Sequence, residues 1–191
     1  MAGAAPEVRT IAVISAGRTG RAIAQLAAQG GYRTILEDLL PNALRRAETE
    51  IHAQLDRAVE SGNVSADAAQ AAISRLEFAG TVEEAARQAD LVIELVPEEL
   101  ESKIEIFTLL DKICRPGTIL ASQLSSLSIT EISRVTYRAG NCLGMRFEEP
   151  VDTRKRLELI RSPETDDDTV AAAVEVGKRL GKGVMVITES K

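Results

Sequence analysis

Residues 10–20 read TIAVISAGRTG, and they decide how the rest of the chain is interpreted. The first five residues are apolar or β-branched and predict a buried strand, Thr10–Ile14. A turn with two glycines follows, and an Ala- and Leu-rich segment of helical periodicity then runs to Gly30. This order of strand, glycine turn and helix predicts the start of a βαβ unit.

The turn matches the pattern G-x-G-x-x-G, with Ser15 in place of the first glycine. A glycine at position 17 lets the backbone approach a pyrophosphate, and Gly20 lets the helix pack close to the strand. The free N–H groups and positive end of that helix favour an anion. The turn therefore predicts a loop for dinucleotide phosphates, and the candidate cofactor-binding residues are Ser15, Ala16, Gly17, Arg18, Thr19 and Gly20. The alternative is a strand–helix turn that binds nothing.

Asp38 follows a second predicted strand, Arg33–Glu37. An acidic residue at this place accepts hydrogen bonds from the adenosine ribose, and its charge disfavours the 2′-phosphate of NADP. The alternative role for Asp38 is to cap the next helix. If the turn requires a positive φ at Ser15, the serine costs on the order of 1–3 kcal/mol of backbone strain.

Strands and helices alternate over the remaining chain. Further strands are predicted near Phe78 and at Leu91–Val96, Thr118–Ser122, Cys142–Phe147, Leu157–Ile160 and Val184–Ile187. Further helices are predicted at about Pro41–Glu60, Ala66–Arg75, Val82–Gln88, Leu100–Ile113, Ile129–Arg134 and Asp167–Leu180. The pattern predicts an α/β fold of Rossmann type, with one domain over residues 1–191. We expect a doubly wound, mostly parallel sheet with extra C-terminal strands, and an inserted helical pair that projects from the sheet.

The composition excludes several classes of protein. The net charge is −6, aromatic residues make up 3% and tryptophan is absent. The sequence therefore has neither the excess positive charge nor the many aromatic residues that are typical of nucleic-acid-binding proteins. Cys114 and Cys142 form no CxxC pair, and we expect reduced thiols and no metal site. The segment Met1–Pro6 lacks the charged n-region and following apolar stretch of a secretory signal, so we expect none, and no apolar run approaches the roughly 20 residues of a membrane span. We expect a soluble, cytoplasmic protein with no membrane association.

The chain resembles the N-terminal NAD-binding domain of the 3-hydroxyacyl-CoA dehydrogenases, from about Arg9 to Ile187. The resemblance is carried by residues 11–25, 90–94, 96–98 and 125–132, with Pro150 and Glu158. It implies a Rossmann sheet extended by extra strands and NAD as the cofactor. It also implies an ancestral reaction of fatty-acid metabolism, hydride transfer between NAD and the 3-hydroxyl carbon of an acyl-CoA.

By position, the resemblance also implies roles for single residues. Asp38 is expected to hold the adenosine ribose, and Glu98 and Lys103 to lie along the cofactor or its nicotinamide end. Ser125 stands at the position of the family serine that touches the substrate oxygen and the nicotinamide region. The alternative for Glu98, Lys103 and Ser125 is an ordinary role at a helix start or in a loop.

The resemblance fails at the catalytic dyad, which in the family is a histidine and a glutamate. The histidine lies in a stretch Gly-Leu-His-Phe-Phe-Asn-Pro, whereas residues 144–150 here read GMRFEEP, so that Arg146 replaces the histidine. Glu158 stands at the glutamate position. Arginine has a pKa above about 12 and cannot accept the hydroxyl proton. We expect Arg146 and Glu158 to form an ion pair on adjacent strands, while Arg146 remains able to polarise a carbonyl group.

Other departures lie near the same site. Glu149 replaces the family asparagine, and Gln123-Leu124 replaces Asn-Thr before the paired serines. The sole histidine, His52, is predicted to be a surface or groove residue of the long helix rather than a catalytic one. The candidate catalytic residues are therefore Ser125, Arg146 and Glu158, in a site whose standard reaction we expect to be impaired.

In the family a helical domain of about a hundred residues follows this domain and closes the acyl-CoA cleft. The chain ends at Lys191, where that domain would begin. The leading hypothesis is an NAD(H)-binding domain that lacks the standard dehydrogenase activity. The alternatives are an active reductase that uses Arg146 and Glu158 on a different substrate, and a non-enzymatic NAD-binding subunit or sensor. A homo-oligomer or a partner chain that covers the face left by the missing domain is also expected as a possible assembly.

Overall fold

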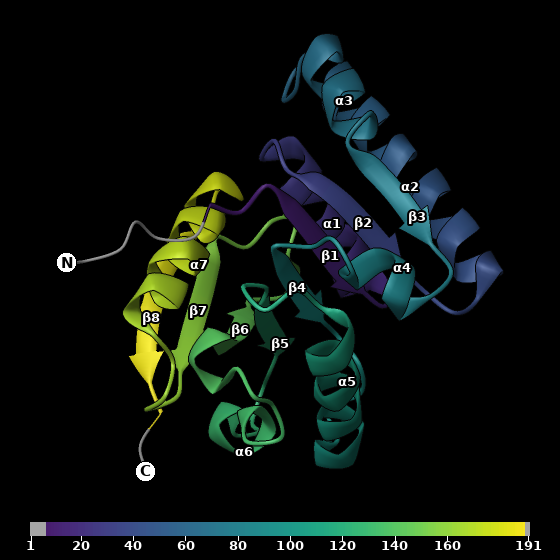
Figure 1. Ribbon diagram of the computed structural model, residues 1–191. Coiled ribbons are helices and arrows are strands. Elements are labelled where there is room, and N and C mark those ends of the chain that lie inside the picture. The colour runs from purple at the N-terminus through teal and green to yellow at the C-terminus, as the bar shows by residue number, and fades with distance from the viewer. Residues whose placement is uncertain (1–6, 190–191) are drawn as a thin grey trace.

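The computed structural model describes residues 7–189, which form one eight-stranded sheet with helices on both faces (Figure 1). The strands are β1 (Thr10–Ile14), β2 (Arg33–Glu37), β3 (Leu76–Ala79), β4 (Leu91–Glu94), β5 (Ile119–Gln123), β6 (Cys142–Phe147), β7 (Arg156–Arg161) and β8 (Gly183–Thr188). The helices are α1 (Arg18–Gln29), α2 (Pro41–Glu60), α3 (Ala66–Ile73), α4 (Val82–Ala86), α5 (Leu100–Ile113), α6 (Ile129–Ser133) and α7 (Asp167–Arg179), with a short 3₁₀ turn at Ala139–Asn141.

The strand order is β3-β2-β1-β4-β5-β6-β7-β8. All neighbouring strands are parallel except β6 and β7, which pair in antiparallel fashion with Arg146 opposite Glu158. The chain fills the sheet outward from β1 in one direction and then from β4 in the other. The switch between β1 and β4 leaves a crevice at the carboxyl ends of the strands, where open α/β sheets bind their ligands. The predicted doubly wound, mostly parallel sheet with extra C-terminal strands is confirmed.

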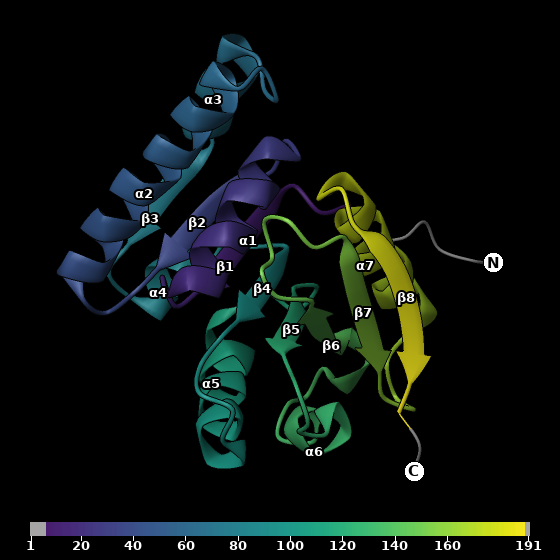
Figure 2. The same cartoon turned by 180° about the vertical axis from the view of Figure 1, so that it is seen from behind.

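Each face of the sheet has its own apolar core. Buried side chains of α1, α2, α3 and α7 pack on one face, and those of α4, α5 and α6 pack on the other. The view from behind shows α1 lying over β1 and β2 (Figure 2). All five residues of β1 are buried, because the strand lies between neighbours and under helices on both sides. The cores are built from Ala, Ile, Leu and Val, as the low aromatic content predicts.

The helical pair α2 and α3 lies beside the β3 edge of the sheet and extends beyond the strands (Figure 1). Pro41 starts α2 at a position where its missing N–H is not needed. The Ser65 hydroxyl accepts a hydrogen bond from the N–H of Ala68 and caps α3, as predicted. Only Ala47, Ile51 and Leu55 of α2 are buried, so most of this long helix faces solvent.

Most predicted elements are confirmed, and their ends differ by a few residues. The strand predicted at Leu91–Val96 ends at Glu94, because the Glu94 carboxylate accepts the N–H of Val96 at 2.9 Å and turns the chain. The 3₁₀ turn at Ala139–Asn141 was not predicted. Among residues 7–189, no helix is long and apolar enough to cross a membrane. The prediction about the segment Met1–Pro6 lies outside the described residues.

Candidate functional site

The turn between β1 and α1 has the backbone that a phosphate loop requires. Ser15 adopts φ = 89°, in the left-handed region that favours glycine, and its N–H donates to the Glu37 carbonyl oxygen at 2.9 Å. A Cβ at Gly20 would lie 2.0 Å from the Ser15 carbonyl oxygen, so only glycine fits there. A Cβ at Gly17 would meet nothing closer than the Ser15 hydroxyl at 3.8 Å, so the backbone at Gly17 is open to a ligand. Ser15 is therefore strained, and both glycines fit the dinucleotide pattern.

Asp38 reaches across to this turn. One carboxylate oxygen accepts the N–H of Ala16 at 3.0 Å, and the other accepts the N–H of Leu40 at 2.9 Å. These bonds fix the carboxylate at the carboxyl end of β2, directly beside the predicted phosphate loop. The bond to Leu40 lies before the helix, and α2 has Leu40 as its N-cap residue with no side-chain cap, so Asp38 does not cap α2. The role of Asp38 at the adenosine ribose stays a prediction.

A cleft of about 230 Å³ opens at the switch point of the sheet. It is lined by Ser15, Gly17, Arg18, Thr19, Gly20, Leu95, Val96, Glu98 and Gln123. These residues come from the carboxyl ends of β1, β4 and β5, which the topology places side by side. The cleft brings the predicted phosphate loop and Glu98 together. The residues present fit NAD: the backbone at Gly17 is open, the first turn of α1 has no acidic residue of its own, and the Asp38 carboxylate lies beside the loop.

Glu98 is held by the loop that carries Ser125. One Glu98 carboxylate oxygen accepts the N–H groups of Ser125, Ser126 and Leu127 at 2.8, 2.9 and 3.3 Å. Burial raises the pKa of the Glu98 carboxyl, but the three N–H groups outweigh it and the net pKa is lowered. Glu98 therefore remains a carboxylate and fixes the position of the exposed Ser125 at the end of β5.

Lys103 lies beneath the cleft and has no exposed surface. Its ammonium group contacts Glu94 Oε1 at 3.1 Å and donates to the carbonyl oxygens of Val96 and Gln123 at 3.3 and 3.0 Å. Burial raises the pKa of the Glu94 carboxyl, and the Lys103 ammonium and the Ser122 hydroxyl oppose this rise. In this structure the buried Lys103 side chain joins the ends of β4 and β5 from below. Its expected place along the cofactor or its nicotinamide end stays a prediction.

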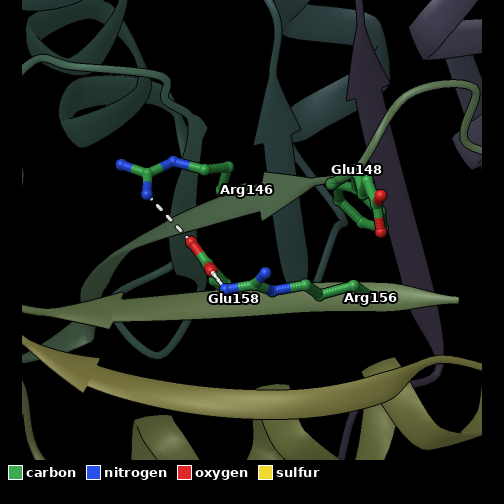
Figure 3. A pocket seen from close by; sticks show the side chains of 5 residues that line it. Arg146, Glu148, Arg156 and Glu158 are labelled. Atoms are coloured by element: carbon green, nitrogen blue, oxygen red, sulfur yellow. Dashed lines mark hydrogen bonds and ion pairs between the residues drawn. The ribbon is translucent and has the colours of Figure 1, made fainter. Parts of the chain in front are cut away.

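A second cavity, of about 210 Å³, lies over β6 and β7 and is lined by Arg146, Phe147, Glu148, Arg156 and Glu158. Arg146 and Glu158 face each other on these neighbouring strands, and Glu148 lies farther along, away from the pair (Figure 3). The Arg146 guanidinium donates to Glu158 at 2.8 Å, and Arg156 holds the other oxygen of the same carboxylate. The predicted ion pair is therefore present, and Glu158 is shared between two arginines.

Arg146 also ties this pair to the Ser125 loop. Its guanidinium donates to the Leu124 carbonyl oxygen at 3.2 Å and to the Ser125 carbonyl oxygen at 2.8 Å. Ser125, Arg146 and Glu158, the three candidate catalytic residues, are thus brought together at the ends of β5, β6 and β7. His52 is half-buried on α2 and is not among the residues that line either cavity.

Two contributing residues were not predicted from the sequence. Arg156 was missed, although it stands two residues before Glu158 and so shares its face of the strand, a signal that could have found it. Glu94 was missed because nothing in a strand of apolar residues marks the partner of its buried carboxylate. Within residues 7–189, no group of three or more His, Cys, Asp or Glu side chains could hold a metal ion.

Comparisons with known proteins agree with this geometry. Residues 10–190 match the family model for the NAD-binding domain of 3-hydroxyacyl-CoA dehydrogenase. A probable 3-hydroxybutyryl-CoA dehydrogenase of Bacillus subtilis is 37% identical over 96% of this chain and 63% of its own length. The mitochondrial hydroxyacyl-coenzyme A dehydrogenase of Rattus norvegicus is 32% identical over 92% of this chain and 57% of its own length. The chain spans about three fifths of these two relatives.

Solved structures show the same fold. The 3-hydroxybutyryl-CoA dehydrogenase of Escherichia coli K12 superimposes with a TM-score of 0.92 at 32% identity, over 96% of this chain and 39% of that one. The corresponding enzyme of Ralstonia eutropha gives a TM-score of 0.91 at 31% identity, over 96% of this chain and 65% of that one. With the phosphate loop, Asp38 and the switch-point cleft in place, the chain belongs to the 3-hydroxyacyl-CoA dehydrogenase family and matches its NAD-binding domain.

Proposed function

We propose that this chain binds NAD(H) in the switch-point cleft but does not carry out the standard proton transfer of its family. The observation that carries the proposal is the bonding of Arg146. Its guanidinium is held by the Glu158 carboxylate and by the carbonyl oxygens of Leu124 and Ser125. A group held in this way is a fixed cation and not a base.

The chemistry of a 3-hydroxyacyl substrate explains why this matters. NAD, when bound, accepts the hydride from the hydroxyl carbon. The hydroxyl proton must leave for a base on the protein, and a positioned base contributes about 10²–10⁴-fold to the rate. The Arg146 guanidinium is engaged by Glu158 and two carbonyl oxygens, and Glu158 is already shared between Arg146 and Arg156. Residues of the phosphate loop and Asp38 would hold the cofactor, while the residue at the catalytic position cannot accept the proton.

Two measurements test this proposal. NADH binding, followed by its fluorescence or by calorimetry, is expected in the micromolar to millimolar range typical of nicotinamide cofactors. Oxidation of NADH with a short 3-ketoacyl-CoA is expected to be at least about a hundredfold slower than in the variant Arg146→His. The histidine restores a group that donates the proton to the carbonyl oxygen in this direction and accepts it from the hydroxyl group in the reverse direction. Absence of binding at millimolar NADH would refute the cofactor role. A wild-type rate equal to that of Arg146→His would refute the loss of proton transfer.

A second function is favoured by the exposure of the Arg146 side chain, which is 39% accessible at the edge of the cavity over β6 and β7. A fixed guanidinium at this edge stabilises negative charge that develops on a carbonyl oxygen. The chain would then be a reductase for a different carbonyl substrate, with Arg146 as the electrostatic group and Glu158 holding it. Arg146→Ala should abolish NADH oxidation with such a substrate, and an unchanged rate would exclude this role.

The remaining functional statements are proposals as well. An acyl-CoA or another small carbonyl compound would enter beside Ser125 from the cavity at Arg146. A homo-oligomer or a partner chain that covers the face used by the family's helical domain stays a prediction. A sensor or subunit role without chemistry, a single-domain organisation and a cytoplasmic location stay predictions. Light scattering with and without NADH tests the assembly, and a strict monomer in both conditions would argue against it.

A further inference from the structure

The loop between β6 and β7 places a carboxylate on the first turn of α1. The Thr19 hydroxyl donates a hydrogen bond to Glu149 Oε1. The Arg18 guanidinium lies 3.7 Å from Glu149 Oε2. Glu149 belongs to a segment far away in the sequence, and the fold of β6 and β7 brings it back to the start of the helix. A negative charge of the protein itself therefore lies on the phosphate loop.

The same groups are those that a pyrophosphate would use. α1 begins at Arg18 after an extended Gly17, with no side-chain cap and no acidic residue of its own in the first turn. Its N–H groups and positive end attract an anion. Arg18 lines the switch-point cleft and also the neighbouring cavity that holds Glu149. The Glu149 carboxylate and a pyrophosphate in the cleft would therefore share one cation and repel each other.

Arg18 and Arg21 differ in how firmly they are held. Arg21 is 2.5 Å from Glu50 and also donates to the Ala16 carbonyl oxygen, so its charge is already engaged. The side chain of Arg18 is 77% exposed and its contact with Glu149 is long. An ion pair of this kind contributes little to the stability of the fold. Removing the Glu149 charge is therefore expected to change ligand binding far more than folding.

We propose that Glu149 is an intramolecular competitor of the cofactor pyrophosphate. Its carboxylate binds Thr19 and Arg18 while the cleft is empty, and it must release them when a dinucleotide binds. The competition lowers the affinity of the phosphate loop for NAD(H) and speeds release of the cofactor. Glu149 thus sets how tightly this chain holds its dinucleotide, and it does so by electrostatics rather than by contact with the adenosine. The inference rests on NAD binding in the switch-point cleft.

The test is an NADH titration of the wild type and of Glu149→Gln, which removes the charge and keeps the size. We expect Glu149→Gln to bind NADH roughly tenfold more tightly, the effect of one partly screened unit charge near the ligand. The variant should also bind ADP-ribose roughly tenfold more tightly than the wild type does. Its affinity for adenosine, which has no phosphate, should equal that of the wild type. Glu149→Asn should show the same gain.

The matched control is Asp152→Asn, which removes a carboxylate from the same loop and the same cavity but not one bonded to Thr19 or Arg18. Its affinity for NADH should stay within twofold of the wild type. A thermal melt of each variant shows whether it is folded, and melting points close to the wild type are expected.

Three outcomes would overturn the inference. Equal or weaker NADH binding by Glu149→Gln would show that the carboxylate does not compete. An equal gain for Asp152→Asn would show that only net charge matters. An equal gain for adenosine would place the effect away from the phosphates. If neither the wild type nor Glu149→Gln binds NADH at millimolar concentration, cofactor binding itself is wrong, whereas equal binding by both refutes only the competition.

Discussion

Glu37 at the end of β2 predicts a pH dependence of stability that can be isolated with one substitution. Its side chain is only 2% exposed, and among residues 7–189 its Oε1 atom has no hydrogen-bond partner. Burial raises the pKa of the Glu37 carboxyl to about 7, and the neighbouring Asp38 carboxylate adds to the rise. The Ser15 backbone N–H opposes the rise, but a carboxylate buried in this way is still costly, and protonation lowers that cost.

The sign and size follow from linkage between protonation and folding. The unfolded chain releases the Glu37 proton near pH 4.5, and the folded chain releases it near pH 7. Between these values the folded state binds more proton, so the free energy of unfolding falls as the pH rises from 4.5 to 7. At about 1.4 kcal/mol per pH unit, a difference of about 2.5 units amounts to roughly 3 kcal/mol. Well above pH 7, the free energy of unfolding no longer changes with the titration of Glu37.

The substitution Glu37→Gln removes this titration and keeps the shape of the side chain. Its free energy of unfolding should match that of the wild type near pH 4.5 and exceed it by up to about 3 kcal/mol at pH 8. Urea unfolding followed by far-ultraviolet circular dichroism at pH 5, 6, 7 and 8 measures the difference. For a chain of this size, the melting temperature at pH 8 should rise by roughly 6–12 °C.

The control for Glu37→Gln is Glu84→Gln, which removes an exposed carboxylate on α4. Its curve should run parallel to that of the wild type at every pH. The reasoning about Glu37 fails if the Glu37→Gln and wild-type curves also run parallel between pH 5 and 8. It fails equally if the variant is less stable than the wild type at pH 8.

Three further predictions concern the packing around the site. Gly20→Ala should destabilise the chain by about 3 kcal/mol or more and abolish NADH binding, because the new Cβ meets the Ser15 carbonyl oxygen. The control is Gly80→Ala, whose Cβ would have no atom within 4 Å and which should leave the thermal melt nearly unchanged. Lys103→Met leaves the Glu94 carboxylate buried without a counter-charge, so the free energy of unfolding in urea should fall by about 3–5 kcal/mol. Adding Glu94→Gln should restore most of that loss. Burial raises the pKa of the Cys114 and Cys142 thiols to about 11. A disulfide reagent at pH 8 should therefore label them only after urea is added, and rapid labelling of the folded chain would contradict their burial.

The features that the sequence predicted well are local. The β1 strand, the glycine turn and the start of α1 are adjacent in the chain, and each residue type has one backbone requirement, so their pattern is sufficient. The pairing of Arg146 with Glu158 was also predicted, because the resemblance implies that the two residues lie on adjacent strands and their opposite charges attract each other.

The features that the sequence did not predict depend on side-chain directions across distant segments. Lys103 belongs to a helix that starts at the edge of the cleft, and only the packing of α5 on the sheet shows that its ammonium group points beneath it. Glu98 was placed along the cofactor, but its carboxylate also closes a turn of backbone N–H groups whose shape cannot be read from composition. The contact between Glu149 and Thr19 joins segments 130 residues apart, and a departure from the family pattern at Glu149 gave no indication of its partner.

The carboxyl edge of the sheet retains the scaffold of a dehydrogenase while its charged groups are satisfied by the protein itself. Asp38 and Glu98 accept backbone N–H groups, which leaves the phosphate loop and the Ser125 segment in place. Glu149 lies on the anion-binding end of α1, and Glu158 is bound by Arg146 where the family has a base. The first pair fixes the loops on either side of the switch-point cleft. If both proposals hold, Glu149 opposes the charge of the cofactor phosphates, and Arg146 leaves no acceptor for the substrate's proton. Substitutions at Glu149 and Arg146 should therefore act on separate quantities, cofactor affinity and turnover, and the double variant should show the two effects multiplied rather than merged.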